Sequence, residues 1–339
     1  MKEANLDWKN LSFGYLKTDY NIRSYFRDGA WTKPELTDDE SVNMHMAATV
    51  FHYGQAAFEG LKAFRGVDGK IRIFRPDENA KRMIETADYI QMARPTEELF
   101  VDMVKQIVKA NERFVPPYGT GASLYIRPVL FGTGAQVGVK PSDEYLLIVF
   151  VTPVGPYYKG GFEPVKFIID RDHDRAAPCG TGHVKVGGNY AASLLSSEWA
   201  HDKGYAGVVY LDSGEKKYID ECGAANFFGI RGNSYVTPDS RSVLKSITNK
   251  SIQTLAKDMG LKVEKRHVPL TELPEFSEAG ACGTAAVISP IGEIYDPEFD
   301  RKYIFNGGKA GPWCTKLYNK LRAIQYGEES DTHGWNVVL

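Results

Sequence analysis

The chain has 339 residues, of which 43% are hydrophobic and 25% are charged, and its formal net charge is −2. This length is enough to bury a sizeable core and favours two domains. Since neither sign of charge dominates, we expect no nucleic acid and no anionic membrane among the partners.

The cysteines and the apolar segments predict a protein of a reducing compartment. The four cysteines lie far apart, with no Cys-x-x-Cys spacing, which disfavours a zinc site and a disulfide framework. No apolar run approaches the roughly 20 residues needed to span a bilayer, and the first ten residues lack the apolar stretch of a secretory signal. We therefore expect a globular cytoplasmic protein without a membrane segment or a metal site.

In chain order, the first half alternates between strand-like and amphipathic segments. Met83, Ala87 and Ile90 recur at helical spacing after Asp77, which makes Asp77 the candidate N-cap of a helix. The predicted strands are residues 70–76, 123–131 and 145–154, and the predicted helices are residues 77–93 and 97–115.

A Gly- and Pro-rich stretch at 155–164 is the predicted linker between a small N-terminal α/β domain (1–154) and a large C-terminal domain (165–339). Gly260 is the expected C-cap of a helix in the second half. Because strands and helices mix without regular βαβ alternation, we expect an α+β fold rather than a doubly wound sheet. The predicted strands here are residues 165–170, 206–212, 226–230 and 285–289, and the predicted helices are residues 250–260 and 315–327.

The familiar short motifs are absent. The stretch GTGAQVG at 132–138 has the spacing GxGxxxG and not GxGxxG, which disfavours a dinucleotide fingerprint. There is no GxxxxGK[ST], no HExxH and no GxSxG, so P-loop, zincin and α/β-hydrolase chemistry are disfavoured. The acidic DHD at 172–174 fits a solvated turn better than a metal site.

One lysine stands alone in an apolar context, in the segment GHVKVGGNYAASLLSSEWA at 182–200. In a strand, Val184 and Val186 share one face and Lys185 projects from the other. In a part-apolar site the pKa of this lysine falls, and its neutral amine becomes a nucleophile toward carbonyl groups. By itself, the segment fits a strand-edge lysine that extends into solvent somewhat better.

The residues after this lysine allow close approach of a ligand. Gly187 and Gly188 predict a tight turn without side chains, next to which a ligand can lie against the backbone. Asn189 is then the candidate N-cap of the helix that follows.

Three further segments have the residue types that a pyridoxal phosphate site needs. Glu221 precedes a run of small residues up to Asn226, and a carboxylate there suits the ring nitrogen of a flat cofactor. By itself, Glu221 fits a turn or surface carboxylate better. Residues 246–248 open a predicted helix whose N–H groups suit a phosphate, although an ordinary capped helix fits equally well. Residues 283–285 offer further N–H groups and a hydroxyl.

Together these segments resemble the class IV aminotransferases, which are pyridoxal-phosphate enzymes of fold type IV, and among them the branched-chain-amino-acid aminotransferases. The resemblance covers nearly the whole chain and implies two α/β domains, the C-terminal one binding the cofactor, with the cofactor site at their interface. Six blocks carry it in family order: FHYGQAAFEGLKAFRG at 51–66, IRIFRPDENAKRM at 71–83, SLYIRPVLFG at 123–132, KVGGNYAASL at 185–194, DECGAANFF at 220–228 and AIQYG at 323–327.

The resemblance implies a role for each cofactor residue. Lys185 matches the catalytic Schiff-base lysine, Tyr190 the tyrosine that hydrogen-bonds the phenolic oxygen of the cofactor, and Glu221 the partner of the ring nitrogen. The cofactor phosphate is expected at Arg82, Ile247, Thr248 and Thr284.

The resemblance also implies the substrate site. The substrate carboxylate is expected near Tyr125, Arg127, Thr284 and Ala285. Part of the pocket wall comes from a neighbouring subunit in this family, so a homodimer with a shared active-site wall is expected. The pocket-lining positions are expected at Tyr53, Phe58 and Tyr157.

The chain departs from the class pattern at a few positions. Asn249 stands where a basic residue is usual, and Tyr235 stands where a small apolar residue usually leads into the threonine. Ala286 and Ser289 occupy the positions of the Cys-x-x-Cys redox pair of mammalian members, so that switch is absent.

The implied activity is the transfer of an amino group from L-leucine, L-isoleucine or L-valine to 2-oxoglutarate, giving branched-chain 2-oxo acids and L-glutamate. A D-amino-acid transaminase and an aminodeoxychorismate lyase are shorter relatives that fit FEGLKAFRG and IQYG poorly. A non-catalytic carrier of pyridoxal phosphate remains the alternative from another functional class, although a carrier has no need of Tyr125, Arg127 and Thr284 around a second ligand.

Overall fold

The computed structural model describes residues 3–157 and 161–339, which form two compact units. The first unit contains Met1–Pro156, Val184–Gly188 and Ile324–Leu339, and the second contains Tyr157–His183 and Asn189–Ala323. Two short later segments thus belong to the N-terminal unit, and one of them contains Lys185. The division at 155–164 remains a prediction.

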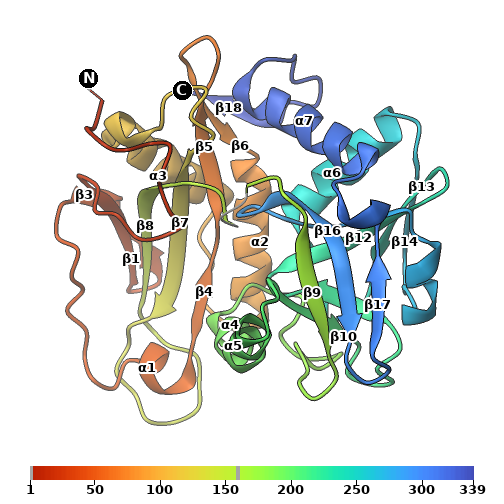
Figure 1. The fold of residues 1–339 in the computed structure, drawn as a ribbon. Coiled ribbons are helices and arrows are strands. Elements are labelled where there is room, and N and C mark those ends of the chain that lie inside the picture. The colour runs from red at the N-terminus through yellow and green to blue at the C-terminus, as the bar shows by residue number, and fades with distance from the viewer. Residues whose placement is uncertain (1–2, 158–160) are drawn as a thin grey trace. The chain divides into compact units, whose positions relative to one another are not determined.

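The N-terminal unit is built on an antiparallel sheet of nine strands (Figure 1). The order is β18-β6-β5-β7-β8-β1-β2, with β3 paired to β1 and β4 paired to β7. The strands are β1 Asn21–Arg27, β2 Ala30–Trp31, β3 Glu35–Thr37, β4 Ala56–Phe58, β5 Leu61–Arg65, β6 Ile71–Phe74, β7 Ser123–Gly132, β8 Tyr145–Val154 and β18 Asn336–Val338.

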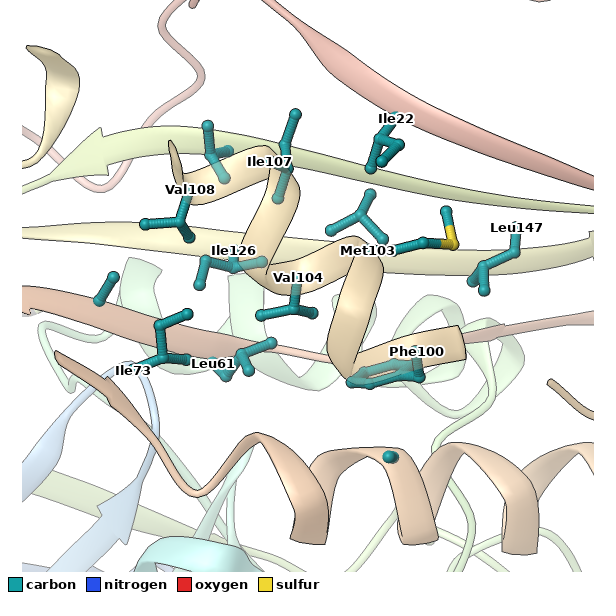
Figure 2. Packing of buried hydrophobic residues seen from close by; sticks show 14 of the residues in the cluster. Ile22, Leu61, Ile73, Phe100, Met103, Val104, Ile107, Val108, Ile126 and Leu147 are labelled. Atoms are coloured by element: carbon teal, nitrogen blue, oxygen red, sulfur yellow. The ribbon is translucent and has the colours of Figure 1, made fainter. Parts of the chain in front are cut away.

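The core of this unit lies between one face of the sheet and helix α3 (Figure 2). Helix α3, Glu97–Ala110, presents Phe100, Met103, Val104, Ile107 and Val108 to Ile22, Leu61, Ile126 and Leu147 of the sheet. Thr96 caps the helix by accepting from the N–H of Leu99 at 3.0 Å. Burial of this apolar stripe, at roughly 25 cal/mol per Å², fixes the helix on the sheet.

Two further α-helices and a short 3-10 helix, Glu112–Phe114, lie in the N-terminal unit. The α-helices are α1, Thr49–Tyr53, and α2, Pro76–Tyr89. The prediction that Asp77 is an N-cap is wrong: Arg75 is the capping position and Pro76 opens α2. Proline suits the first helical position because the N–H that it lacks would have no partner inside the helix there. The Asp77 carboxylate then lies in the first turn, where negative charge is favourable.

The C-terminal unit contains a mixed sheet, in the order β11-β10-β9-β16-β15-β12-β13-β14 with β17 paired to β16. Three pairs are parallel (β9–β10, β9–β16 and β13–β14), and the other pairs are antiparallel. This irregular mixture is the predicted α+β arrangement. The strands are β9 Val165–Asp170, β10 Gly207–Leu211, β11 Ile219–Cys222, β12 Ala225–Arg231, β13 Ser234–Pro238, β14 Lys262–Arg266, β15 Glu278–Gly283, β16 Val287–Asp296 and β17 Arg301–Ile304.

Helices pack on this second sheet, α5 on β10 and α6 on β14 and β15. The C-cap of α6 is Met259 and not Gly260 as predicted; Gly260 follows it at φ +90°, a conformation that glycine adopts without strain. Among the described residues, no helix is long and apolar enough to cross a bilayer. The helices of this part of the chain are α4 Gly187–Ala192, α5 Leu194–Asp202, α6 Ile247–Asp258 and α7 Pro312–Tyr326.

Candidate active site

The backbone of Lys185 is fixed on both sides within the N-terminal unit. Its carbonyl accepts from the N–H of Phe58 at 3.1 Å, and its own N–H donates to Thr86 Oγ1 of α2 at 3.1 Å. The predicted strand is wrong, because only a single antiparallel bridge, from Val186 to Ala57, forms here. Val184 and Val186 are nevertheless buried and Lys185 only partly so, as a strand-like alternation requires.

The two glycines after Lys185 begin a helix rather than a tight turn. Helix α4 starts at Gly187, and a Cβ placed on Gly187 or Gly188 meets no atom within 4 Å. The predicted N-cap role of Asn189 is wrong, because this residue lies inside α4. Its side chain exchanges hydrogen bonds with Thr181, accepting at 2.7 Å and donating to the Thr181 carbonyl at 2.8 Å. The open space beside the glycines leaves room for a ligand against the backbone.

The Lys185 side chain lies over an aromatic ring and beside charges of both signs. Its Nζ lies 4.6 Å from the centroid of the Phe58 ring. Burial, followed by the neighbouring Arg82 guanidinium, lowers the pKa of Lys185 to about 8, while the Glu59 carboxylate acts in the opposite direction. The amine is therefore deprotonated far more readily than an ordinary lysine, which a nucleophile requires.

Arg82 forms a buried, bidentate ion pair with a residue that the sequence did not single out. Its Nε and Nη2 donate to the two oxygens of Glu59 at 2.7 and 2.9 Å. Glu59 also accepts from Asn79 Nδ2 at 2.6 Å and from the N–H of Gly60 at 3.2 Å, and it is fully buried. Since Asn79, Arg82 and Thr86 follow one another at helical spacing, one face of α2 supplies the contacts of Asn79 and Arg82 to Glu59 and that of Thr86 to the N–H of Lys185.

Tyr125 and Arg127 lie on the same face of β7, as strand alternation predicts. Arg127 Nη2 donates to Tyr125 Oη at 3.0 Å, and the guanidinium lies 4.9 Å from the centroid of the Phe58 ring. Arg127 Nε is buried without a hydrogen-bond partner among the described residues. A buried donor without a partner is costly, so this nitrogen is suited to an anionic ligand.

Two neighbours complete this wall. Phe13 packs edge-on against the Tyr125 ring, with centroids 5.1 Å apart. A Cβ on Gly60 would lie 2.1 Å from Tyr125 Oη, so only glycine permits the observed position of that hydroxyl. No periodic pattern in the sequence points to Phe13, because this residue comes from an irregular N-terminal segment.

Tyr53 and Tyr157, two predicted pocket residues, are exposed. Tyr53 is 40% exposed at the end of α1, and its hydroxyl donates to the carbonyl of Val137, itself 80% exposed. Tyr157 is 43% exposed and directly precedes the residues outside the described range. Their place in a substrate pocket remains a prediction.

Glu221, in the C-terminal unit, lies on β11 with 2% of its surface exposed. Its Oε2 pairs with Arg175 Nε at 2.8 Å, and its Oε1 accepts from the N–H of Leu244 at 2.6 Å and from Asn226 Nδ2 at 3.4 Å. A surface or turn position for Glu221 is therefore wrong. Arg175, which the sequence did not single out, holds the carboxylate from a loop.

Helix α6 begins at the segment predicted to bind phosphate. Ser246 is its N-cap, and Ile247 and Thr248 follow in the first turn, where N–H groups have no partner inside the helix. Both departures from the class pattern meet here, because Tyr235 Oη donates to Asn249 Oδ1 at 2.8 Å. The hydroxyl of Tyr235 and the amide oxygen of Asn249 thus satisfy each other as donor and acceptor.

Asn249 continues this network toward the carboxylate. Its Nδ2 donates to Asn226 Oδ1 at 3.1 Å and to Thr237 Oγ1 at 3.0 Å, and its Oδ1 accepts from Gln253 at 3.1 Å. Asn226 in turn contacts Glu221. The first turn of α6 and the Glu221 carboxylate are therefore connected through amide side chains.

The remaining predicted residues lie on a turn and on α4. Thr284 and Ala285 lie in the turn between β15 and β16, where Val287 has φ +60°. A β-branched residue rarely adopts this conformation, and such strain often occurs at functional sites. Tyr190 lies in α4 and is partly buried.

Comparisons with known proteins identify the family. The family model described as amino-transferase class IV matches residues 56–294. The branched-chain-amino-acid aminotransferase of Haemophilus influenzae is 48% identical over 99% of this chain and 99% of its own length. The solved branched-chain amino acid aminotransferase of Escherichia coli superposes with a TM-score of 0.79 at 26% identity, covering 94% of this chain and 99% of that chain. A second sequence relative, the branched-chain-amino-acid aminotransferase of Helicobacter pylori, is 48% identical over 98% of this chain and 97% of its own length. The chain therefore belongs to the class IV aminotransferases: it is an enzyme with the α+β fold type IV architecture, as the sequence blocks predicted.

Proposed function

We propose that this enzyme transfers the amino group of L-leucine, L-isoleucine or L-valine to 2-oxoglutarate through pyridoxal phosphate, giving branched-chain 2-oxo acids and L-glutamate, and that it catalyses the reverse reaction. The observation that carries the proposal is Lys185, a partly buried lysine with a lowered pKa between Phe58 and Arg82. Family membership and the name of the Haemophilus influenzae relative support the choice of substrate.

The residues present fit pyridoxal phosphate on structural grounds. The space beside Gly187 and Gly188 is open, Arg127 Nε is buried without a partner among the described residues, and the donor set includes a lysine, a buried carboxylate and a helix N-terminus. When bound, the cofactor supplies an electron-accepting ring that stabilises negative charge on the substrate Cα.

Lys185 performs the proton transfer in this proposal. With a pKa of about 8, a substantial fraction of its amine is neutral near pH 8 and accepts the proton from the substrate Cα as a general base. The two backbone hydrogen bonds to Phe58 and Thr86 hold its Cα in place, so that only the side chain moves.

The phosphate and the ring nitrogen of the cofactor call for groups of opposite charge. We assign the phosphate to Arg82 together with the first-turn N–H groups of Ile247 and Thr248 and the Thr284 turn, because a guanidinium and a helix N-terminus both favour anions. We assign Glu221 to the ring nitrogen, and the hydroxyl of Tyr190 to the phenolic oxygen.

The substrate wall combines aromatic rings with one cation. Arg127 and the N–H groups of Thr284 and Ala285 bind the α-carboxylate, and Phe58 with Tyr125 contacts the aliphatic side chain. Burial of branched aliphatic surface is favourable by roughly 25 cal/mol per Å². When glutamate is the substrate, we assign its γ-carboxylate to the hydroxyls of Tyr53 and Tyr157, and the Tyr53 hydroxyl then exchanges its hydrogen bond to the Val137 carbonyl for one to the carboxylate.

A second copy of the chain is proposed to complete this wall. Strand alternation sends Tyr125, Arg127, Val129 and Phe131 to the sheet face opposite α3, where Val129 and Phe131 belong to an apolar cluster with Ile148. A cavity of about 350 Å³ opens on this face. The apolar face continues the substrate wall, and its burial by a second copy favours a homodimer. Sedimentation of the purified protein tests whether the chain is a dimer in solution.

The reaction is tested by single-turnover spectroscopy of the cofactor band with Leu, Ile, Val, Glu, Asp, Ala and D-Ala. We expect Leu, Ile and Val to react at similar rates, because one methylene discriminates by only about 10–200-fold, with Asp and Ala far slower. A faster reaction with Asp or D-Ala than with Leu would contradict the branched-chain proposal and favour a D-amino-acid transaminase or another specificity. A band that no amino acid changes would indicate a carrier.

A further inference from the structure

The strongest unassigned feature of the N-terminal unit is Glu59, a carboxylate buried beside Lys185 and outside every role given above. It is fully buried, and its two oxygens accept four hydrogen bonds, two from Arg82 and one each from Asn79 and Gly60. It directly follows Phe58, whose ring lies 4.6 Å from Lys185 Nζ and whose N–H donates to the Lys185 carbonyl. A carboxylate with so many donors is held rigidly.

We propose that Glu59 is a positioning residue of the aminotransferase reaction, which fixes the Arg82 guanidinium and offsets its positive charge at Lys185. The inference rests on the proposed role of Lys185. Glu59 acts through Arg82 and has no contact with substrate in this assignment.

The charges around Lys185 determine the direction in which each substitution should shift the pKa of this lysine. The groups that act on the lysine are Arg82 of α2, Glu59 after β4, and Tyr125 and Arg127 of β7. The two guanidinium groups disfavour the ammonium form, and Glu59 favours it. Removing Glu59 alone therefore leaves both cations uncompensated, and Lys185 is deprotonated at lower pH. Removing Arg82 alone has the opposite effect.

The experiment measures the pH at which Lys185 is half reactive. The full-length protein, freed of cofactor by dialysis, is acetylated with trace acetic anhydride at a series of pH values, and the Lys185 peptide is quantified by mass spectrometry. We expect Glu59→Gln to shift the midpoint downward by about one pH unit and Arg82→Gln to shift it upward by a similar amount, as removal of one nearby charge typically does. The Glu59→Gln/Arg82→Gln double variant is expected near the wild-type midpoint.

Two controls separate charge from packing. Glu59→Asp keeps the negative charge, and its midpoint is expected within about 0.3 pH unit of wild type. Glu59→Gln keeps the shape of the side chain without the charge, and its midpoint is expected to shift. Glu278→Gln removes another buried carboxylate, which accepts from the N–H groups of Trp313 and Cys314 at 3.0 and 2.9 Å in the C-terminal unit, and is expected to leave the midpoint unchanged. If Glu59→Gln alone does not fold, the double variant and Arg82→Gln still test the direction.

The outcomes distinguish this inference from the proposed function. Pyridoxal phosphate with borohydride is applied to the wild-type protein in parallel, and labelling of a lysine other than Lys185 would overturn the proposed function. Labelling of Lys185, together with a Glu59→Gln midpoint equal to that of wild type, would overturn the role of Glu59 alone.

Discussion

Each compact unit buries one arginine–glutamate pair at the proposed site, but the two pairs carry opposite assignments. In the N-terminal unit the cation, Arg82, is assigned to the cofactor, and Glu59 is its neutralising partner. In the C-terminal unit the anion, Glu221, is assigned to the cofactor, and Arg175 is its partner. Breaking a buried pair by removing one partner is costly because it leaves a charge without compensation. Both units therefore bury a ligand-binding charge only together with an opposite charge that holds it in position.

The two pairs also differ in which parts of the chain they connect. Arg82 and Glu59 lie 23 residues apart, and the intervening chain includes β5, β6 and the start of α2. Arg175 and Glu221 lie on a loop and a strand, and Arg175 additionally donates to the carbonyls of Gly182 and Ser242. The second pair thus holds two loops as well as the carboxylate, so we expect its loss to affect folding more.

The largest expected effect is that of Lys185→Ala, which removes the lysine assigned to the chemical step. Turnover should be lost essentially completely, because the variant lacks the amine that transfers the proton. Weak binding of pyridoxal phosphate through the phosphate contacts should remain, measured by equilibrium dialysis. Borohydride reduction and peptide mapping of the wild-type protein should label Lys185, and turnover by the variant above about one-hundredth of the wild-type rate would contradict the assignment.

Arg175→Met should reduce the free energy of unfolding by about 3–5 kcal/mol, the usual cost of leaving one member of a buried ion pair without its partner. Urea denaturation followed by circular dichroism measures this loss. The Arg175→Met/Glu221→Met double variant serves as control and should be more stable than Arg175→Met. Equal stability of the two variants would show that the charge of Glu221 is not what makes the single change costly.

Glu221→Gln should lower the rate of the chemical step by about 10²–10³, which is typical of removing one preorganised electrostatic group. The variant should be less stable than wild type, because Arg175 loses its anionic partner. It should still fold, because the amide oxygen can accept from the N–H of Leu244 and Arg175 still donates to the carbonyls of Gly182 and Ser242. Stopped-flow measurement of the cofactor band with L-leucine gives the rate. A variant within twofold of wild type would assign the ring nitrogen to another group.

The sequence predicted the elements well and the charge partners poorly, for a physical reason. Residues 145–154 and 165–170 were predicted as strands and are β8 and β9. The prediction succeeds because the side chains that a strand buries are apolar, and their spacing is visible in the sequence. Glu59 and Arg175 left no such signal. Each contacts its partner only through the tertiary fold, and no local period encodes such a contact.

The short segment around Lys185 shows a different limit. Alternation of Val184, Lys185 and Val186 correctly indicated which side chains are buried, but it did not indicate that a single bridge to Ala57 would replace a strand. Gly187 and Asn189 were expected in a turn and at a cap, and both lie in α4. Glycine and asparagine have weak helix propensity, and tertiary contacts override it here.

The lowered pKa of Lys185 predicts a pH dependence of stability. In the unfolded chain this lysine has its ordinary pKa of 10.5, and in the folded protein the pKa is about 8. Between these values the unfolded state binds more protons, so stability should rise with pH from about 8 to 10.5. Thermal denaturation of the cofactor-free protein measures it, with Lys185→Met as the control that lacks this contribution. The same slope in both proteins would contradict a lowered pKa.

The smallest expected effect tests the coupling between the two departures from the class pattern. Tyr235→Phe removes the hydroxyl that donates to Asn249 Oδ1 at 2.8 Å, but this oxygen still accepts from Gln253 at 3.1 Å. We therefore expect a loss of only about 1 kcal/mol in the free energy of unfolding, the typical net value of one hydrogen bond.

Asn249→Leu is the sharper variant of the same network. It leaves the buried Tyr235 hydroxyl, Asn226 Oδ1 and the Thr237 hydroxyl each without one partner, and unsatisfied buried groups cost about 1–3 kcal/mol apiece. Because Asn226 contacts Glu221, the affinity for pyridoxal phosphate should also fall in Asn249→Leu and stay near wild type in Tyr235→Phe, measured by absorbance titration. If both variants bind the cofactor as the wild-type protein does, the amide network stabilises α6 without positioning Glu221, and the carboxylate is then held by Arg175 and the N–H of Leu244.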